Sequence, residues 1–217
     1  MKIFKNSDYK KINIISTLLC FLPIIIGLVF YSQLPEQVAI HFNAQNQPDN
    51  YASKFIAIFV LPLGLLLLHV FVIASLEFDS RKKNTGKALQ MLSRVSIPII
   101  STYVVIITIA YSLQPGKVDI GFLTLLLVAT IFLIIGNLLP KCKPNVTVGI
   151  KLPTTLSDET NWNKTHRFGG IVWVVCALVM YVVAFVKLFW LVPIIIGIMV
   201  IVPIIYSYVL ASNAKKH

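Results

Sequence analysis

One predicted helix carries an acid, an indole, an imidazole or hydroxyl, and a glycine on a single face. These residues are three or four positions apart, which is the spacing of neighbours along one side of a helix. They are Asp158, Trp162, Thr165 or His166, and Gly169. An acid and an imidazole beside a gap are groups that proton transfer or ligand binding can use. This face is the most pocket-like feature of the sequence, and a membrane enzyme using the 158–167 helix is one open interpretation.

Other patterns of catalytic residues are missing from the sequence. It contains no HExxH zinc motif, no Gly-rich phosphate-binding loop and no GxSxG nucleophile elbow. Cys142, Asp158 and His166 include metal-ligating types, but their spacing matches no known zinc pattern. We therefore predict a protein without catalytic residues, metal or cofactor.

A second polar group lies beside aromatic residues in the segment 33–54. Its members are His41, Asn43, Asp49 and Lys54, with Phe42 and Tyr51 next to them. One interpretation is a solvated loop held by local side-chain bonds. The other is a recognition surface, because exposed aromatics among hydrogen-bonding groups are typical of loops that bind peptides. The composition leaves both interpretations open.

The elements that carry these residues are predicted to be membrane helices. The 217 residues are 57% hydrophobic and 12% charged, which leaves too little polar surface for a soluble domain. A helix that crosses a bilayer needs about 20 apolar residues, and six stretches have this length. They are residues 13–31, 55–76, 95–113, 120–139, 170–186 and 188–210. We predict an all-α, polytopic bundle of about six spans, formed by residues 1–217 as one membrane domain.

The last two spans are predicted to form a tight helical hairpin. From Gly169 to Leu210 the one charged residue is Lys187, and a single helix of that length would be about twice as long as the bilayer core is thick. Lys187, Phe189 and Trp190 suit the headgroup level, so we place the turn there.

The positions of the cations predict the orientation in the membrane. With a cytoplasmic N-terminus, 16 of the 19 basic residues fall on the inner side, and Lys54, Lys117 and Lys187 remain outside. This bias favours both termini in the cytoplasm, with residues 33–54 extracellular and 140–168 cytoplasmic. The net charge of +11 is then a topology signal, and the partner it indicates is the lipid bilayer rather than nucleic acid.

The first apolar stretch is predicted to stay in the protein as a span. It is longer than the apolar region of a typical signal peptide, and no small-residue cleavage site follows it. The three cysteines lie in spans or in the inner loop, where thiols remain reduced. They are Cys20, Cys142 and Cys176.

Both long polar segments are predicted to be ordered. In the outer segment, alternation at Val38, Ile40 and Phe42 indicates a short strand, followed by a turn-rich run over residues 43–50. In the inner segment three prolines exclude a continuous helix, and residues 155–158 match a helix-start capping box. From there a helix can continue into the fifth span.

Ionisable residues are nearly absent from the predicted spans. Only His69 lies well inside one, where a neutral imidazole bonded to a neighbouring helix is favoured over a proton relay. For Asn137 we favour a structural hydrogen bond that anchors the inner loop. The stretch 77–94 is interpreted as a solvated basic loop, with a helix resting at the interface as the alternative.

Several motifs together resemble the SdpI family of bacterial membrane proteins. The inner-loop motif is carried by Gly136-Asn-Leu-Leu-Pro140, Lys143-Pro-Asn145, Gly149-Ile-Lys-Leu-Pro153-Thr-Thr155-Leu, and Glu159-Thr-Asn-Trp162-Asn-Lys-Thr165-His166-Arg167. The extracellular motif is carried by Leu34-Pro35-Glu-Gln-Val-Ala-Ile-His41-Phe42-Asn43, Pro48-Asp49 and Ser53-Lys54. The chain departs from the family pattern with Lys151 for an arginine, Thr154 for a tryptophan, and Asn46 or Gln47 for a glycine.

The resemblance implies a non-enzymatic immunity and signalling protein. Such a protein gives resistance to a secreted killing peptide, and when the peptide is present it holds a transcriptional repressor at the membrane. It implies that His41, Phe42, Asn43, Asp49 and Lys54 bind the extracellular toxin peptide. The implied cytoplasmic motif is Asn137, Pro140, Asn145, Gly149, Pro153, Thr155, Glu159, Trp162, Thr165, His166 and Arg167. A small permease or exporter of a toxic peptide or other substrate is the rival hypothesis.

Overall fold

Six membrane-length helices dominate the computed structural model, which describes residues 8–214. The candidate spans are Lys10–Phe30, Ile56–Phe78, Lys87–Leu113, Ile120–Lys141, Glu159–Val186 and Phe189–Ala214. Within the described residues the remaining regular structure is short turns of helix and one two-stranded sheet. The prediction of an all-α bundle with six spans is confirmed.

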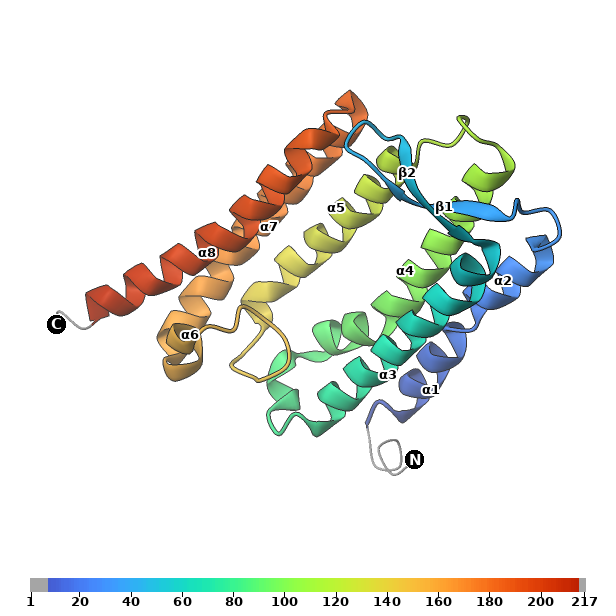
Figure 1. Ribbon diagram of the computed structural model, residues 1–217. Coiled ribbons are helices and arrows are strands. Elements are labelled where there is room, and N and C mark those ends of the chain that lie inside the picture. Colours follow the sequence, from blue (N-terminus) through green and yellow to red (C-terminus); the bar gives the residue numbers. More distant parts are fainter. Residues whose placement is uncertain (1–7, 215–217) are drawn as a thin grey trace. The chain divides into compact units, whose positions relative to one another are not determined.

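The chain divides into two compact units. One comprises the described residues up to Glu77 together with Met91–Thr124, and the other comprises Phe78–Gln90 and the residues from Leu125 onward. The first unit carries α1 (Lys10–Leu19), α2 (Leu22–Phe30), α3 (Leu61–Phe78) and most of α4 (Lys87–Leu113). It also contains the strands β1 (Gln37–Phe42) and β2 (Pro48–Ser53), which form a hairpin in Figure 1.

Two prolines lie where helical segments of the first unit begin. Pro23 has no N–H to donate to Leu19, and the first span is accordingly divided between α1 and α2. The π-helical turn η2 (Ile56–Val60) ends just before Pro62, near the start of α3. This turn meets α2 closely, because a Cβ on Gly27 would lie 2.3 Å from a methyl group of Ile58. The contact requires glycine.

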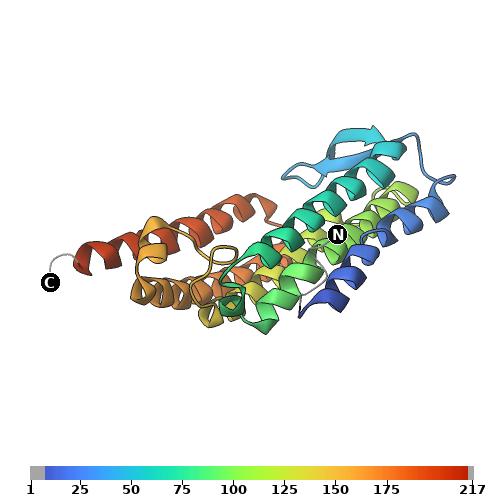
Figure 2. The ribbon, with the colours of Figure 1, turned by 90° about the horizontal axis from the view of Figure 1, so that it is seen from below.

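The hairpin has an irregular antiparallel register. Val38 pairs with Ala52 and Phe42 with Pro48, with irregularities on either side of His41. The turn places Asn46 in the left-handed region at φ 60°, a conformation that asparagine tolerates. Figure 2 shows the hairpin at one end of α3. The predicted first strand is therefore present, but the second strand was missed, because it begins at Pro48 inside the run interpreted as turns.

The second unit is built on three long helices, one short helix and a folded loop. Its helices are α5 (Ile120–Leu138, from Leu125 onward), α6 (Pro153–Ser157), α7 (Glu159–Val186) and α8 (Val192–Ala214), with short 3-10 turns η3 (Lys82–Thr85), η4 (Leu139–Lys141) and η5 (Phe189–Leu191). The helices α7 and α8 lie side by side in Figures 1 and 2. Helix α7 ends where Lys187 adopts a left-handed conformation at φ 59°.

Small residues and a proline shape the helix contacts of the second unit. A Cβ on Gly170 of α7 would lie 2.6 Å from the Gly136 carbonyl oxygen of α5, so these two backbones meet directly. In α8, Pro203 cannot donate to the Met199 carbonyl, and the Trp173 indole donates to that oxygen at 2.9 Å instead. The Trp173 bond satisfies a carbonyl that the proline would leave without a donor.

The interpretation of residues 77–94 as a solvated basic loop is wrong. Asp79 is 5% exposed and accepts a hydrogen bond from the Thr147 hydroxyl, while Asn84 donates to the Pro144 carbonyl at 2.7 Å. These bonds attach the stretch to residues 143–147 within the second unit. Arg94, counted with the loop cations, is fully buried in α4.

Candidate functional site

The β1–β2 hairpin presents a polar pair at its surface. The His41 imidazole Nδ1 lies 2.5 Å from Asp49 Oδ1 across the two strands, and these side chains are 65% and 42% exposed. Ile40 and Tyr51 on the same hairpin are also exposed. The structure thus brings together two of the five residues predicted to bind an extracellular ligand, in a setting that a partner can reach.

The other three predicted hairpin residues make structural contacts. Asn43 Oδ1 accepts the Gln45 and Gln47 backbone N–H groups at 3.0 Å each, which shapes the turn. Phe42 packs edge-on against Tyr111 of α4. Lys54 pairs with Glu36 at 2.9 Å and lies over an aromatic ring at the end of α2. These contacts hold the hairpin in place rather than forming one surface with the His41–Asp49 pair.

Asn46 fixes the hairpin turn to the start of α5. Its Nδ2 donates to Asp119 Oδ1 and its Oδ1 accepts from the Gly121 backbone N–H, each at 2.7 Å. A glycine could adopt the same backbone conformation but would supply neither bond. Asn46 is therefore an anchor of the turn within the first unit.

In the second unit, the motif loop (residues 140–158) is organised by a buried asparagine. Asn145 Oδ1 accepts the backbone N–H groups of Thr147 and Val148, and its Nδ2 donates to the Lys143 carbonyl at 3.0 Å. The same Nδ2 lies 3.1 Å from Cys142 Sγ. Burial raises the pKa of the Cys142 thiol, with a smaller contribution from the charge of Asp79, so the thiol is neutral and unreactive.

Trp162 and His166 of α7 pack against Gly149 of the motif loop. The two rings stack at 4.0 Å, and the Trp162 indole donates to the Cys142 carbonyl at 2.7 Å. His166 Nε2 accepts the Ile150 N–H at 2.9 Å, which leaves Nδ1 to donate to the Trp162 carbonyl at 2.8 Å. Gly149 has φ 121°, and a Cβ there would lie 2.5 Å from His166 Nε2. Only glycine fits.

Hydroxyl and amide groups complete the attachment of the loop to α7 and α8. Thr155 accepts the Leu152 N–H and donates to the Ile150 carbonyl. Asn161 Oδ1 receives bonds from Thr165 and Ser207, and its Nδ2 donates to the Ser207 carbonyl at 2.8 Å. Five of the eleven residues of the predicted cytoplasmic motif are therefore buried in a hydrogen-bonded core, namely Asn145, Thr155, Trp162, Thr165 and His166.

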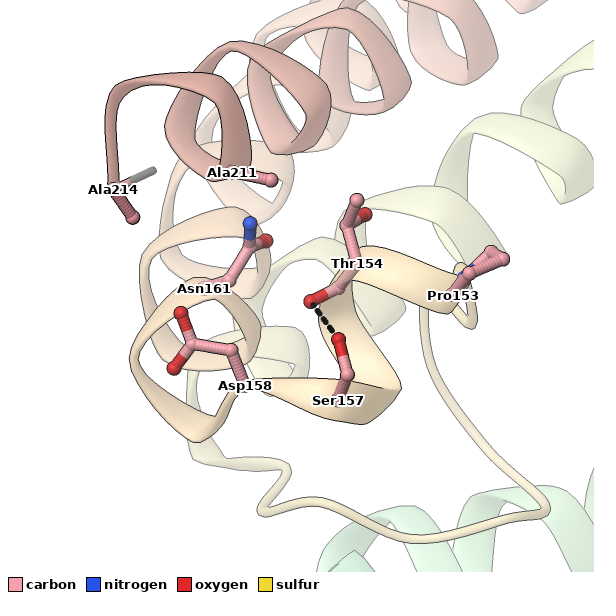
Figure 3. A pocket seen from close by; sticks show the side chains of 7 residues that line it. All are labelled: Pro153, Thr154, Ser157, Asp158, Asn161, Ala211 and Ala214. Atoms are coloured by element: carbon pink, nitrogen blue, oxygen red, sulfur yellow. Dashed lines mark hydrogen bonds between the residues drawn. The ribbon is translucent and has the colours of Figure 1, made fainter. Parts of the chain in front are cut away.

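A cavity of about 320 Å³ opens at the end of this unit. Figure 3 shows the Asp158 carboxylate and the Asn161 amide at its wall, with Ala211 from α8. Asp158 caps α7 by accepting the Thr160 N–H at 2.8 Å. The expectation that Asp158 shares a pocket with Trp162 and His166 is wrong, since those rings are buried against the motif loop. Helix α7 also begins at this cap rather than at Thr155.

Among the motif residues, Pro140, Pro153, Glu159 and Arg167 are exposed. Asn137 is exposed as well, and its side chain donates to the Leu133 carbonyl of its own helix. The expected anchoring of the inner loop by Asn137 is therefore wrong. The exposed members of the motif are the ones that an inner partner could contact.

A buried ion pair in the first unit was missed by the sequence reasoning. Arg94 donates to Glu77 at 2.8 Å and to Asn13 Oδ1 at 2.7 Å, and Asn13 donates to the same Glu77 oxygen at 2.9 Å. The side chains of Arg94 and Glu77 are 0% and 5% exposed. Arg94 and Glu77 each lie near the end of a span, so the sequence alone places both side chains among the lipid headgroups. The spans are thus not free of charge.

His69 of α3 lies in the same unit, where it contacts α1 one turn of helix beyond Asn13. Its Nε2 is 3.2 Å from the Ser16 hydroxyl, and the residue is fully buried. The contact between helices agrees with the favoured interpretation of a hydrogen-bonded imidazole.

Six membrane-length helices with a folded hairpin and a buried polar loop define a polytopic membrane protein whose extramembrane elements are ordered. Residues 141–207 match the SdpI/YfhL protein family, and residues 18–66 match a domain of unknown function, DUF1648. The immunity protein SdpI of Bacillus subtilis (strain 168) is 31% identical over 175 residues, covering 81% of this chain and 82% of that protein. No solved structure matches the chain.

The chain belongs to the SdpI family, as its motifs predict, and it is a multi-pass bacterial membrane protein.

Proposed function

We propose that this protein confers immunity to a secreted killing peptide, which it binds through the exposed surface of the hairpin. The similarity to a protein named for immunity is the observation that carries the proposal. In support, the His41–Asp49 pair offers hydrogen-bonding groups beside the exposed Ile40 and Tyr51. Phe42, Asn43 and Lys54 act indirectly, by holding that surface in place.

Deletion of the gene tests the proposal in the native host. The deletion strain is exposed to supernatants from a broad panel of related strains, and survival is compared with that of the parent. We expect sensitivity to at least one supernatant, restored to resistance by the wild-type gene. Equal survival across the panel would refute the immunity function.

A variant pair then locates the binding surface. The combined His41→Ala and Asp49→Ala variant is expected to reach the membrane at the wild-type level and to fail in protection. Lys117→Ala is the matched control, because it removes another exposed polar side chain of the same unit outside the hairpin. Equal protection by the double variant would exclude the His41–Asp49 pair from recognition.

The proposal extends to a cytoplasmic partner, a transcriptional repressor held by the motif loop when the peptide is bound. The residues proposed to contact it are the exposed Pro153, Glu159 and Arg167, with the Asp158 cavity beside them. Coupling requires that the peptide bind one arrangement of the helices more tightly than another. Glu159→Ala with Arg167→Ala is expected to abolish co-purification of the repressor while leaving protection intact.

Export of a toxic peptide is the second candidate function, and the Arg94–Glu77 pair favours it. Buried ionisable groups in membrane segments are typical of transport pathways, and His69 lies in the same unit. His69→Ala distinguishes the two candidates. Loss of protection, at an unchanged membrane level and with the peptide still bound, would support export.

A membrane enzyme using the 158–167 helix has the least support. Both ring nitrogens of His166 are engaged with backbone groups, and the ring is buried under Gly149. A general base needs a lone pair within reach of a substrate, which this arrangement does not provide. These contacts of His166 therefore support the proposal of a non-enzymatic protein.

A further inference from the structure

A small cavity lies beneath the hairpin in the first unit, at the level of the helices. It has a volume of about 60 Å³ and is lined by residues of β1, η2, α3 and α4. Ala57, Ser101 and Val105 form its buried part, whereas Ile40 and Val104 are partly exposed at its edge. Ile40 directly precedes His41 in β1, so the cavity wall and the proposed recognition surface share this strand.

One polar group of this cavity has no hydrogen-bond partner among residues 8–214. The Ser101 hydroxyl is buried, with the residue 1% exposed, and it makes no bond to the helix carbonyls around it. Other hydroxyls of these helices do find such partners, as Ser75 does with Phe71. A buried hydroxyl without a hydrogen-bond partner costs free energy, and this cost is removed when an acceptor enters the cavity.

The chemistry of the cavity distinguishes its possible occupants. Mostly apolar walls with a few polar groups are typical of ligand sites, and this cavity is lined by two hydroxyl residues, Ser101 and Thr108. Because a cavity of about 150 Å³ accepts benzene, this one has room for about three carbon atoms, the size of a valine side chain. A lipid acyl chain fits the apolar walls but offers no acceptor to Ser101. A peptide supplies both an apolar side chain and backbone carbonyls.

We propose that this cavity receives an apolar side chain of the extracellular killing peptide, with the Ser101 hydroxyl donating to a peptide carbonyl. The inference rests on the proposed function and adds a second, membrane-level contact to the hairpin surface. Recognition then has two parts: polar contacts at His41 and Asp49, and an apolar contact beneath Ile40. The π-helical turn η2 contributes to the cavity wall through Ala57, and such turns are frequent at functional sites.

Ser101→Ala and Val104→Phe test the inference in the deletion strain, with a supernatant against which the wild-type protein protects. Ser101→Ala removes the hydroxyl. We expect cells with this variant to be killed by about five-fold less peptide than cells with the wild-type protein. Because the lost hydroxyl had no partner, the thermal midpoint of the purified variant should be equal or higher. Val104→Phe blocks the cavity from its exposed edge and should weaken protection further. Ser75→Ala is the matched control, with protection equal to wild type.

The outcomes separate this inference from the proposed function. If the wild-type protein protects and both cavity variants protect equally well, the cavity holds only lipid or water, and the inference is overturned while immunity stands. If Ser101→Ala lowers both protection and the thermal midpoint, the hydroxyl is structural, which also overturns the inference. Weakened protection with an undiminished midpoint supports it.

Discussion

Gly149 is required by both its backbone conformation and its neighbours. Its φ of 121° lies where side chains are rarely tolerated, and His166 Nε2 occupies the space of a Cβ. We expect Gly149→Ala to destabilise the protein by more than the roughly 1–3 kcal/mol of the backbone strain alone. The thermal midpoint in detergent measures the loss. Gly116→Ala is the control, because Gly116 also has positive φ (79°) but open space around it.

A difference between these two variants reports the steric contacts with the His166 and Trp162 rings. Equal destabilisation would mean that the steric contact contributes nothing, and that the stacked rings shift to admit the methyl group.

Arg94 and Glu77 stabilise the first unit through a buried ion pair. Removing one partner leaves the other charge buried without its partner, so Arg94→Leu should cost about 3–5 kcal/mol. Arg94→Leu combined with Glu77→Leu should recover part of this loss, since no unpaired charge then remains. Unfolding in detergent by denaturant is the measurement. A double variant less stable than Arg94→Leu would contradict this account.

At this scale the sequence predicts residue identity better than residue role. The family resemblance singled out Gly149 and Asn145, which lie in the motif loop, and His166 of α7, which packs against that loop. The contacts of Gly149 with Trp162 and His166, and the bond from Ile150 to His166, join residues 13 or more positions apart, which no periodicity encodes. Arg94 was misplaced because its partners lie on α1 and α3, distant in the sequence.

Among the elements, the hairpin turn is anchored to the start of α5 by the Asn46 side chain. Asn46→Gly keeps the left-handed turn but removes the bonds to Asp119 and Gly121, whereas Asn46→Ala also strains the backbone by roughly 1–2 kcal/mol. We expect hydrogen exchange in residues 43–50 to rise in the order wild type, Asn46→Gly, Asn46→Ala. Similar exchange in the wild-type and Asn46→Gly proteins would show that the two bonds do not hold the turn.

Element prediction succeeded where hydropathy or alternation was strong. The number of spans and the strand at residues 37–42 followed from such patterns. The second strand was missed because Pro48, Asp49 and Asn50 are turn-forming residues, and only pairing with β1 makes them a strand. The start of α7 was misplaced because Thr155 belongs to the separate short helix α6, and Asp158 caps α7.

For the whole molecule, the proposed function requires that the hairpin and the motif loop face opposite sides of the membrane. Each belongs to a different compact unit, so a signal between them must pass through the helices. The bias of basic residues predicts that the hairpin is extracellular and the motif loop cytoplasmic. This orientation is the condition for binding a secreted peptide.

Single-cysteine labelling tests that orientation directly. The native Cys20, Cys142 and Cys176 are buried and are first replaced by alanine, which leaves a background that must still protect cells. Gln45→Cys places a thiol in the hairpin turn, and Leu156→Cys places one on the exposed side of α6. A membrane-impermeant maleimide applied to intact cells should label the Gln45→Cys variant at once and the Leu156→Cys variant only after permeabilisation.

Two controls make the labelling decisive. Denaturation of the membranes before labelling must expose both thiols equally, and the cysteine-free background must remain unlabelled in intact cells. Labelling of both variants from the same side would place the hairpin and the motif loop together. A peptide bound outside could then not signal to an inner repressor through the helices, and the signalling part of the proposal would be excluded. Protection by the hairpin surface alone would require only that the Gln45→Cys variant react from outside.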